Sequence, residues 1–161
     1  MAKVIARPPA GDLHEVDFPL WAERQAALLR AGQFDELDLD NLIEEGEDLR
    51  RRERRSVESH IETILEHFLK LAFSPAERGR PVTVDKQRAK LARELTATLR
   101  RHLEAELPAL YAGLRRPVAR ELEKDHVPAH ALPAACPCSL DQILDPDWYP
   151  DRRPGPAKPK P

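Results

Sequence analysis

Four carboxylates are the first side chains in the sequence whose type and spacing could do chemistry. They are Glu44, Glu45, Glu47 and Asp48. Clustered carboxylates can hold a divalent cation or act as general acid and base. However, Glu47 precedes Arg51 by four residues and Asp48 precedes Arg52 by four, which is the spacing of ion pairs on an exposed helix. We therefore expect a solvated, salt-bridged helix face here rather than a metal or acid–base cluster.

Two histidines, His60 and His67, form the second candidate site. They are seven residues apart and so share one face of a helix. Chelation of one ion by a helix needs a spacing of four residues, so these two cannot hold an ion alone. We expect them to flank the core and to bond to a neighbouring helix. The alternative is an enzyme or metal-binding protein that uses both histidines with carboxylates of the same helix, beside Trp21.

The sequence also offers ligands for a zinc site, namely His126, His130, Cys136 and Cys138. A single residue between two cysteine ligands is an unusual spacing, and prolines interrupt this segment. A di-metal site in a helical bundle needs two Glu-x-x-His pairs, whereas only Glu123 with His126 has that spacing. We therefore expect no metal and no cofactor.

Five arginines lie between residues 50 and 55, and nucleic-acid binding through Arg50–Arg55 is a further alternative. Glu53 and the preceding carboxylates dilute this positive charge, and the chain as a whole carries a formal net charge of -2. Nucleic-acid-binding domains are usually basic, so we expect no nucleic-acid partner. Arg50, Glu53 and Arg54 instead make a polar interruption in an apolar helix face.

The composition predicts a helical protein with one core. The chain has 161 residues, of which 41% are hydrophobic and 34% charged, so it is neither a disordered tail nor a membrane span. Leucine (22) and alanine (21) dominate, which favours helix over strand. This length is that of one ordinary domain.

A long helix should organise the fold. It should start near Asp38 or Asp40 and run to Phe73, because Pro75 disfavours helix at the residue before it. At 1.5 Å per residue it would be about 50 Å long, so it needs partners along its whole length. Its apolar face is interrupted between Leu49 and Val57.

Caps and prolines divide the rest of the chain. We expect an irregular arm (1–16), a helix from Asp17 to Gly32, and a helix from Thr83 that ends at Pro108. A further helix should begin at Pro108 with a kink or break at Pro117, and a short last helix should begin at Ser139. A proline-rich disordered tail (151–161) follows. The predicted fold is all-α: a single domain (17–150) forming a helical bundle around one long central helix.

Three segments carry a resemblance to a known family. They are Asp17-Phe18 with Trp21, Gln25-Ala26 and Leu29-Arg30; then Leu37-Asp38, Asn41 to Glu45, Asp48-Leu49, Ser59-His60 and Leu65 to Lys70; and finally Cys136-Pro137 with Gln142, Leu144 and Trp148-Tyr149-Pro150. In this order they resemble a family of bacterial proteins catalogued as domain of unknown function 29. The resemblance implies an all-helical fold and supplies no catalytic residue.

The function we expect is that of a cytoplasmic helical protein without catalysis, acting as a protein-interaction or self-associating module. Both cysteines fit a reducing compartment, and the first residues do not form a signal-peptide core. The partner would be another protein or a second copy, with no membrane involved. The candidate binding residues are Trp21, Glu44, Glu45, Asp48, Arg50, Glu53, Arg54, His60, His67 and Lys70.

Overall fold

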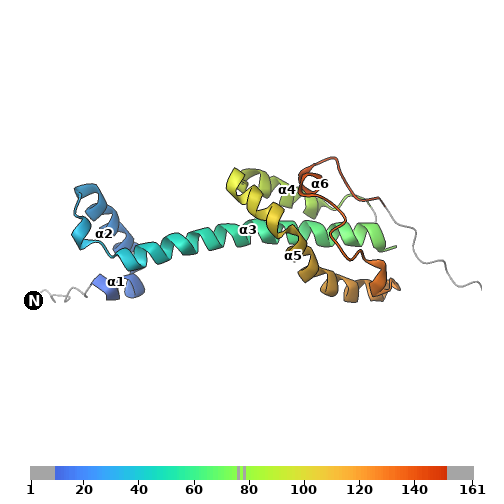
Figure 1. Cartoon of the computed structure of the whole chain (residues 1–161), viewed down its shortest axis with the longest axis horizontal. Helices are drawn as coiled ribbons and strands as arrows, with labels where there is room; N and C mark the ends of the chain where they lie inside the picture. The colour runs from blue at the N-terminus through green and yellow to red at the C-terminus, as the bar shows by residue number, and fades with distance from the viewer. Residues whose placement is uncertain (1–9, 76, 78, 152–161) are drawn as a thin grey trace, which may run out of the picture. The chain divides into compact units, whose positions relative to one another are not determined.

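The all-α prediction is confirmed. The computed structural model describes residues 10–75, 77 and 79–151, and among these it contains helices and no strand. The α-helices are α1 (Ala10–Val16), α2 (Phe18–Ala31), α3 (Leu39–Phe73), α4 (Val82–Glu94), α5 (Ala97–Leu122) and α6 (Leu140–Leu144) (Figure 1). Single turns of 3₁₀-helix occur at Phe34–Glu36, Glu123–Asp125 and Ala129–Ala131.

The described residues form two compact units, and the single domain expected over residues 17–150 stays a prediction. The N-terminal unit extends to Arg51 and the C-terminal unit begins at Arg52. The division falls inside α3, at the arginine-rich segment where the apolar face of the helix is interrupted. Because no apolar side chain between Leu49 and Val57 can anchor a neighbouring element, each unit has its own packing.

The N-terminal unit contains α1, α2 and the first turns of α3. The irregular arm expected over residues 1–16 is wrong for Ala10–Val16, which form α1, whereas residues 1–9 lie outside the described part. Helix α2 has the predicted ends, because the Asp17 carboxylate accepts a hydrogen bond from the Leu20 amide and Gly32 closes the helix at a φ of 70°.

Helix α3 confirms the predicted long helix, with 35 residues in one element. The Asp38 backbone carbonyl accepts from the Leu42 amide, so this residue caps the start of the helix. The helix ends at Phe73, two residues before Pro75, as the steric restriction on the residue before a proline predicts.

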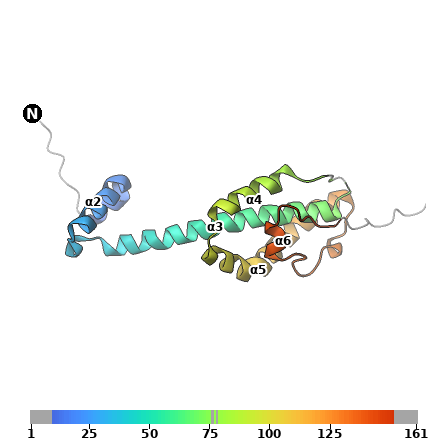
Figure 2. The same cartoon turned by 90° about the horizontal axis from the view of Figure 1, so that it is seen from above.

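The apolar side chains of the second half of α3 form the core of the C-terminal unit. Val57, Ile61 and Ile64 are fully buried, and Leu103, Leu122 and Ile143 close the core from the later helices. Helices α4, α5 and α6 lie around this half of α3 (Figures 1 and 2). This burial supplies most of the apolar contacts of the described chain.

Two boundaries differ from the prediction. The helix expected from Thr83 to Pro108 begins at Val82 and breaks at Leu95, after which the Thr96 hydroxyl accepts from the Leu99 amide and starts α5. Pro108 and Pro117 lie inside α5, and neither proline ends the helix. Leucines spaced by four wind around a continuous helix, so the break at Leu95 lets Leu91 and Leu99 both face the core. Both prolines face solvent, where water can satisfy the carbonyls that lose a partner.

Arg88 holds the last described segment in place. Its guanidinium, 6% exposed, donates hydrogen bonds to the carbonyl oxygens of Ile143 (2.8 Å) and Trp148 (2.8 Å). It also lies over the rings of Phe68 and Tyr149, at 5.3 and 4.8 Å from their centroids. The short helix predicted to begin at Ser139 is confirmed as α6, where Ser139 and Gln142 bond reciprocally in a capping box. Of the expected tail, only Asp151 belongs to the described residues.

Candidate functional site

The N-terminal unit exposes an unusual amount of apolar surface. Among the described residues nine large apolar side chains are exposed, and eight of them belong to this unit; these are Val16, Phe18, Leu20, Leu29, Phe34, Leu39, Ile43 and Leu49. Its buried apolar side chains in the same described part are only Leu13, Trp21 and Leu28. Soluble monomers rarely leave large apolar areas uncovered, so this surface is the first candidate site.

Trp21, one of the predicted site residues, is a buried anchor of this unit. Its side chain is 2% exposed, and its Nε1 donates to Asp38 Oδ2 at 3.0 Å. Asn41 Nδ2 donates to the same oxygen at 2.8 Å. The backbone amide of Asp38 donates to Oε1 of Gln25, which is also 2% exposed. The hydrogen bond from Asn41, together with that from Trp21, lowers the pKa of Asp38 below its ordinary value despite the opposing effect of burial.

Glu45 is paired with a histidine that the sequence analysis did not single out. His14 Nε2 lies 3.1 Å from Glu45 Oε1, and the His14 ring meets the ring of Trp21 edge-on at 4.6 Å. A histidine–carboxylate pair can move a proton, but it needs a reacting group within hydrogen-bond reach. The contacts of this pair join α1 to α3, so its role in the chain is structural.

The remaining predicted residues near the start of α3 lie at the surface. Glu44, Arg50 and Glu53 are exposed, while Asp48 and Arg54 are partly buried. Arg51 forms ion pairs with Asp48 and Glu47, which is the salt-bridged face that the sequence predicted. The expected polar interruption of the helix is confirmed as a solvent-exposed stretch.

His60 and His67 are both partly buried, and the structure connects only the first to a neighbouring carboxylate. His60 Nε2 lies 3.6 Å from Glu94 Oε2 on α4, as expected for a histidine that flanks the core. Glu94 also accepts a hydrogen bond from the Ser56 hydroxyl at 2.9 Å. A third histidine, His102 on α5, lies 2.6 Å from Glu58. These pairs attach α4 and α5 to α3.

Lys70 makes a comparable link near the end of α3. Its ammonium donates to Glu66 at 2.7 Å and to Glu121 of α5 at 2.9 Å. Burial alone would lower the pKa of Lys70, but the hydrogen bonds and charges of Glu66 and Glu121 outweigh it and raise the pKa above its ordinary value. Because a lysine with a raised pKa stays protonated, Lys70 acts as a structural cation and not as a nucleophile.

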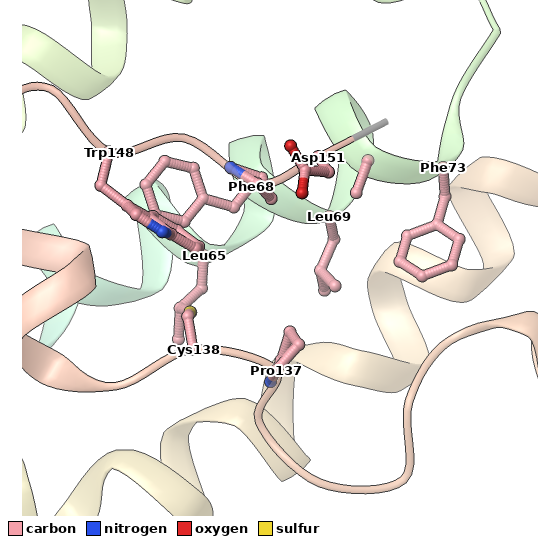
Figure 3. Close-up of a pocket in the computed structure, with 10 residues that line it drawn as sticks. Leu65, Phe68, Leu69, Phe73, Pro137, Cys138, Trp148 and Asp151 are labelled. Atoms are coloured by element: carbon pink, nitrogen blue, oxygen red, sulfur yellow. The ribbon is translucent and has the colours of Figure 1, made fainter. Parts of the chain in front are cut away.

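An apolar pocket of about 310 Å³ lies beside the last turns of α3 (Figure 3). Its walls are mainly Leu65, Phe68 and Leu69, with Cys138 and Trp148 from the later segments (Figure 3). None of the predicted site residues lines it. Asp151 is the one carboxylate in its lining, so the pocket lacks the paired acid and base of a hydrolytic site.

A more polar pocket of about 450 Å³ lies where α3 meets the junction of α4 and α5. Glu53 and Ser56 line it from α3, and Arg93 and Glu94 line it from α4. Ser56 and Thr96 supply the hydroxyls of this lining; the Ser56 hydroxyl donates to Glu94, and the Thr96 hydroxyl oxygen accepts from the Leu99 amide. No histidine lines this pocket, so Glu94 is the group placed to accept a proton from Ser56.

The described histidines, cysteines and carboxylates do not gather into groups of three or more that could hold a metal ion. The four possible zinc ligands of the sequence analysis, which are His126, His130, Cys136 and Cys138, do not form such a group. Cys136 and Cys138 are free thiols, and Cys136 Sγ donates to the Cys138 carbonyl at 3.3 Å. A hydrogen bond with Cys136 and burial both raise the pKa of the Cys138 thiol, so it stays protonated and unreactive.

Sequence reasoning missed four members of the polar cluster around Trp21, which are His14, Gln25, Asp38 and Asn41. Gln25 is a polar exception in the apolar spacing of α2, and a buried glutamine must find a partner. This glutamine was the one sequence signal that could have revealed the polar cluster. Asp38 was expected only as a cap, because nothing in the sequence shows that the turn after α2 brings it to Trp21.

Comparison with family models gives a match to the Domain of unknown function DUF29 over residues 13–149. The match confirms the resemblance drawn from the sequence. Comparison with curated proteins and with solved structures gives no match. None of the helices in the described part of the chain has the length and apolar character needed to cross a membrane.

Proposed function

We propose that this chain, which belongs to the Domain of unknown function DUF29 family, is a non-catalytic module that associates with a second copy of itself through its N-terminal unit. The observation that carries the proposal is the distribution of exposed apolar side chains, eight of nine in the described residues belonging to that unit. A unit with three buried apolar side chains and eight exposed ones has its apolar residues placed for an interface rather than for a core.

The eight side chains leave much of their apolar surface to solvent. Their exposed fractions range from 44% for Phe18 to 77% for Val16. A second copy presents the same side chains, so a symmetric contact can cover apolar surface on both copies at once.

The alternative functions have less support. An enzyme built on His60 and His67 would need both histidines at one pocket, whereas neither lines the pockets described above. For nucleic acid, Arg51 is already paired with Glu47 and Asp48, and the neighbouring carboxylates reduce the local positive charge. We place the protein in a bacterial cytoplasm, since free thiols persist in a reducing compartment.

The test compares surface variants by light scattering at high protein concentration. Wild type should have twice the chain mass of 18.3 kDa, and the triple variant Leu39→Gln/Ile43→Gln/Leu49→Gln should have the mass of one chain. Val82→Gln is the matched control, because Val82 is 65% exposed but belongs to the C-terminal unit. This control should associate like wild type. A monomeric wild type, or a triple variant that still associates, would refute the proposal.

A further inference from the structure

The pocket beside the last turns of α3 has the volume and the lining of a small-molecule site. Ligand pockets have volumes of about 300–1,000 Å³, mainly apolar walls and a few polar groups that orient the ligand. This pocket has a volume of about 310 Å³. Among its described lining residues only Asp151 is charged, and the others are apolar side chains, prolines and the Cys138 thiol.

Contacts outside the pocket hold one of its walls in place. Trp148, which lines the pocket, meets the Phe68 ring edge-on, with the ring centroids 5.4 Å apart. Arg88 donates a hydrogen bond to the Trp148 carbonyl, and the Tyr149 hydroxyl donates to Asp85 at 2.6 Å. Both contacts attach this segment to α4. The wall is therefore formed before any ligand binds, so binding need not order it.

The volume of the pocket sets the size of the occupant. An apolar cavity of about 150 Å³ in a protein core holds one benzene molecule. This pocket is about 310 Å³, which leaves room for an aromatic ring and a short alkyl chain. The Cys138 thiol has a raised pKa and stays neutral, so it adds to the apolar lining. The molecule that fits is compact and mainly apolar.

The charge of the lining sets the sign of the ligand. Asp151 is exposed while it lines the pocket, so its carboxylate lies at the mouth, across from Pro137 (Figure 3). No lysine, arginine or histidine is among the described lining residues. A positive group on the ligand can pair with this carboxylate, whereas a negative group would be repelled. Aromatic rings such as that of Trp148 also attract cations.

We propose that this pocket binds a small organic amine, with its apolar body against Leu65, Phe68 and Trp148 and its ammonium group paired with Asp151 at the mouth. The binding is reversible and involves no covalent step. All described lining residues belong to the C-terminal unit, whereas the proposed self-association uses the N-terminal unit. The two proposals can therefore fail independently.

Three probes with one apolar body test the proposal, namely phenylbutylamine, phenylbutanol and phenylbutyrate. The two tryptophans of the chain report binding through the NMR signals of their indole N–H groups. The Trp148 signal should shift with the amine, and the Trp21 signal, from the N-terminal unit, should not. The amine should bind about tenfold more tightly than the carboxylate probe, with the alcohol between them, because an exposed ion pair is weak.

Three variants locate the binding. Asp151→Asn removes the charge and keeps the size, so the affinities for the three probes should fall within about twofold of one another. Asp147→Asn is the matched control, because Asp147 is exposed in the same segment and is not among the lining residues. It should keep the preference for the amine. Ala72→Phe places a ring in the pocket, so none of the probes should shift the Trp148 signal.

Several outcomes would overturn the proposal. An amine that binds no more tightly than the carboxylate probe would do so, as would a preference that persists in Asp151→Asn or is lost equally in Asp147→Asn. Unchanged binding in Ala72→Phe would place the probes elsewhere. No shift of the Trp148 signal with any probe would also contradict it, whether the pocket stays empty or holds the chain's own residues 152–161.

Discussion

Trp21 Nε1 donates a hydrogen bond to Asp38 Oδ2 at 3.0 Å, and this bond joins α2 to the residue that caps α3. The two residues are 17 positions apart in the sequence, on either side of the turn that follows α2. With so few buried apolar side chains in the N-terminal unit, its internal order depends on this polar contact.

Removing the carboxylate at Asp38 should loosen the N-terminal unit. Asp38→Ala deletes the acceptor for Trp21 and Asn41 and leaves the buried indole nitrogen without a partner. We expect a loss of about 2 kcal/mol in the free energy of unfolding of this unit. Asp40→Ala is the control, because Asp40 is exposed nearby. Urea titration followed by circular dichroism measures both, and an equal loss in the two variants would contradict the role given to Asp38.

The contribution of Asp38 should depend on pH. Its pKa in the folded protein lies below the ordinary 3.8, so its charge stabilises the fold at pH values above 3.8. That stability is lost as the pH falls through the lowered folded pKa. Asp38→Asn keeps a capping side chain and lacks the charge. The stability difference between wild type and Asp38→Asn should be constant near neutral pH and shrink below pH 3.8. A difference unaffected by acid would contradict this assignment.

Arg88 should be a sensitive polar position in the C-terminal unit. Arg88→Met keeps the volume but leaves the carbonyls of Ile143 and Trp148 without their donor. We expect a loss of about 3 kcal/mol in the free energy of unfolding. Arg80→Met tests whether stacking alone matters, since Arg80 lies 4.8 Å from the Tyr149 ring centroid and is exposed. The free energy of unfolding of Arg80→Met should fall by less than about 1 kcal/mol. Similar losses in the two variants would rule out the carbonyl contacts as the cause.

The helical elements follow from local signals in the sequence. Asp17 and Gly32 define α2, Asp38 and Pro75 bound α3, and Ser139 starts α6, because each signal acts within one or two turns. The break at Leu95 was missed since evenly spaced leucines suggested continuity across it. The prediction that Pro108 ends a helix is wrong. A proline on the solvent side of a helix removes one backbone hydrogen bond, and water can take its place.

The candidate site depended on information that the sequence does not carry locally. Phe18 and Leu29 follow the spacing of a buried helix face, yet they are 44% and 48% exposed, since periodicity shows which residues share a face and not what covers it. Trp21 was predicted as a candidate binding residue, and the structure shows it buried, with a bond to Asp38 that depends on the intervening turn.

Sedimentation equilibrium of the untagged wild-type chain, over a wide range of concentrations, tests the central claim most directly. The account predicts an average mass that rises from 18.3 kDa at high dilution to twice that value at high concentration, because a second copy covers the apolar surface of the N-terminal unit. A mass that stays at 18.3 kDa throughout would contradict it.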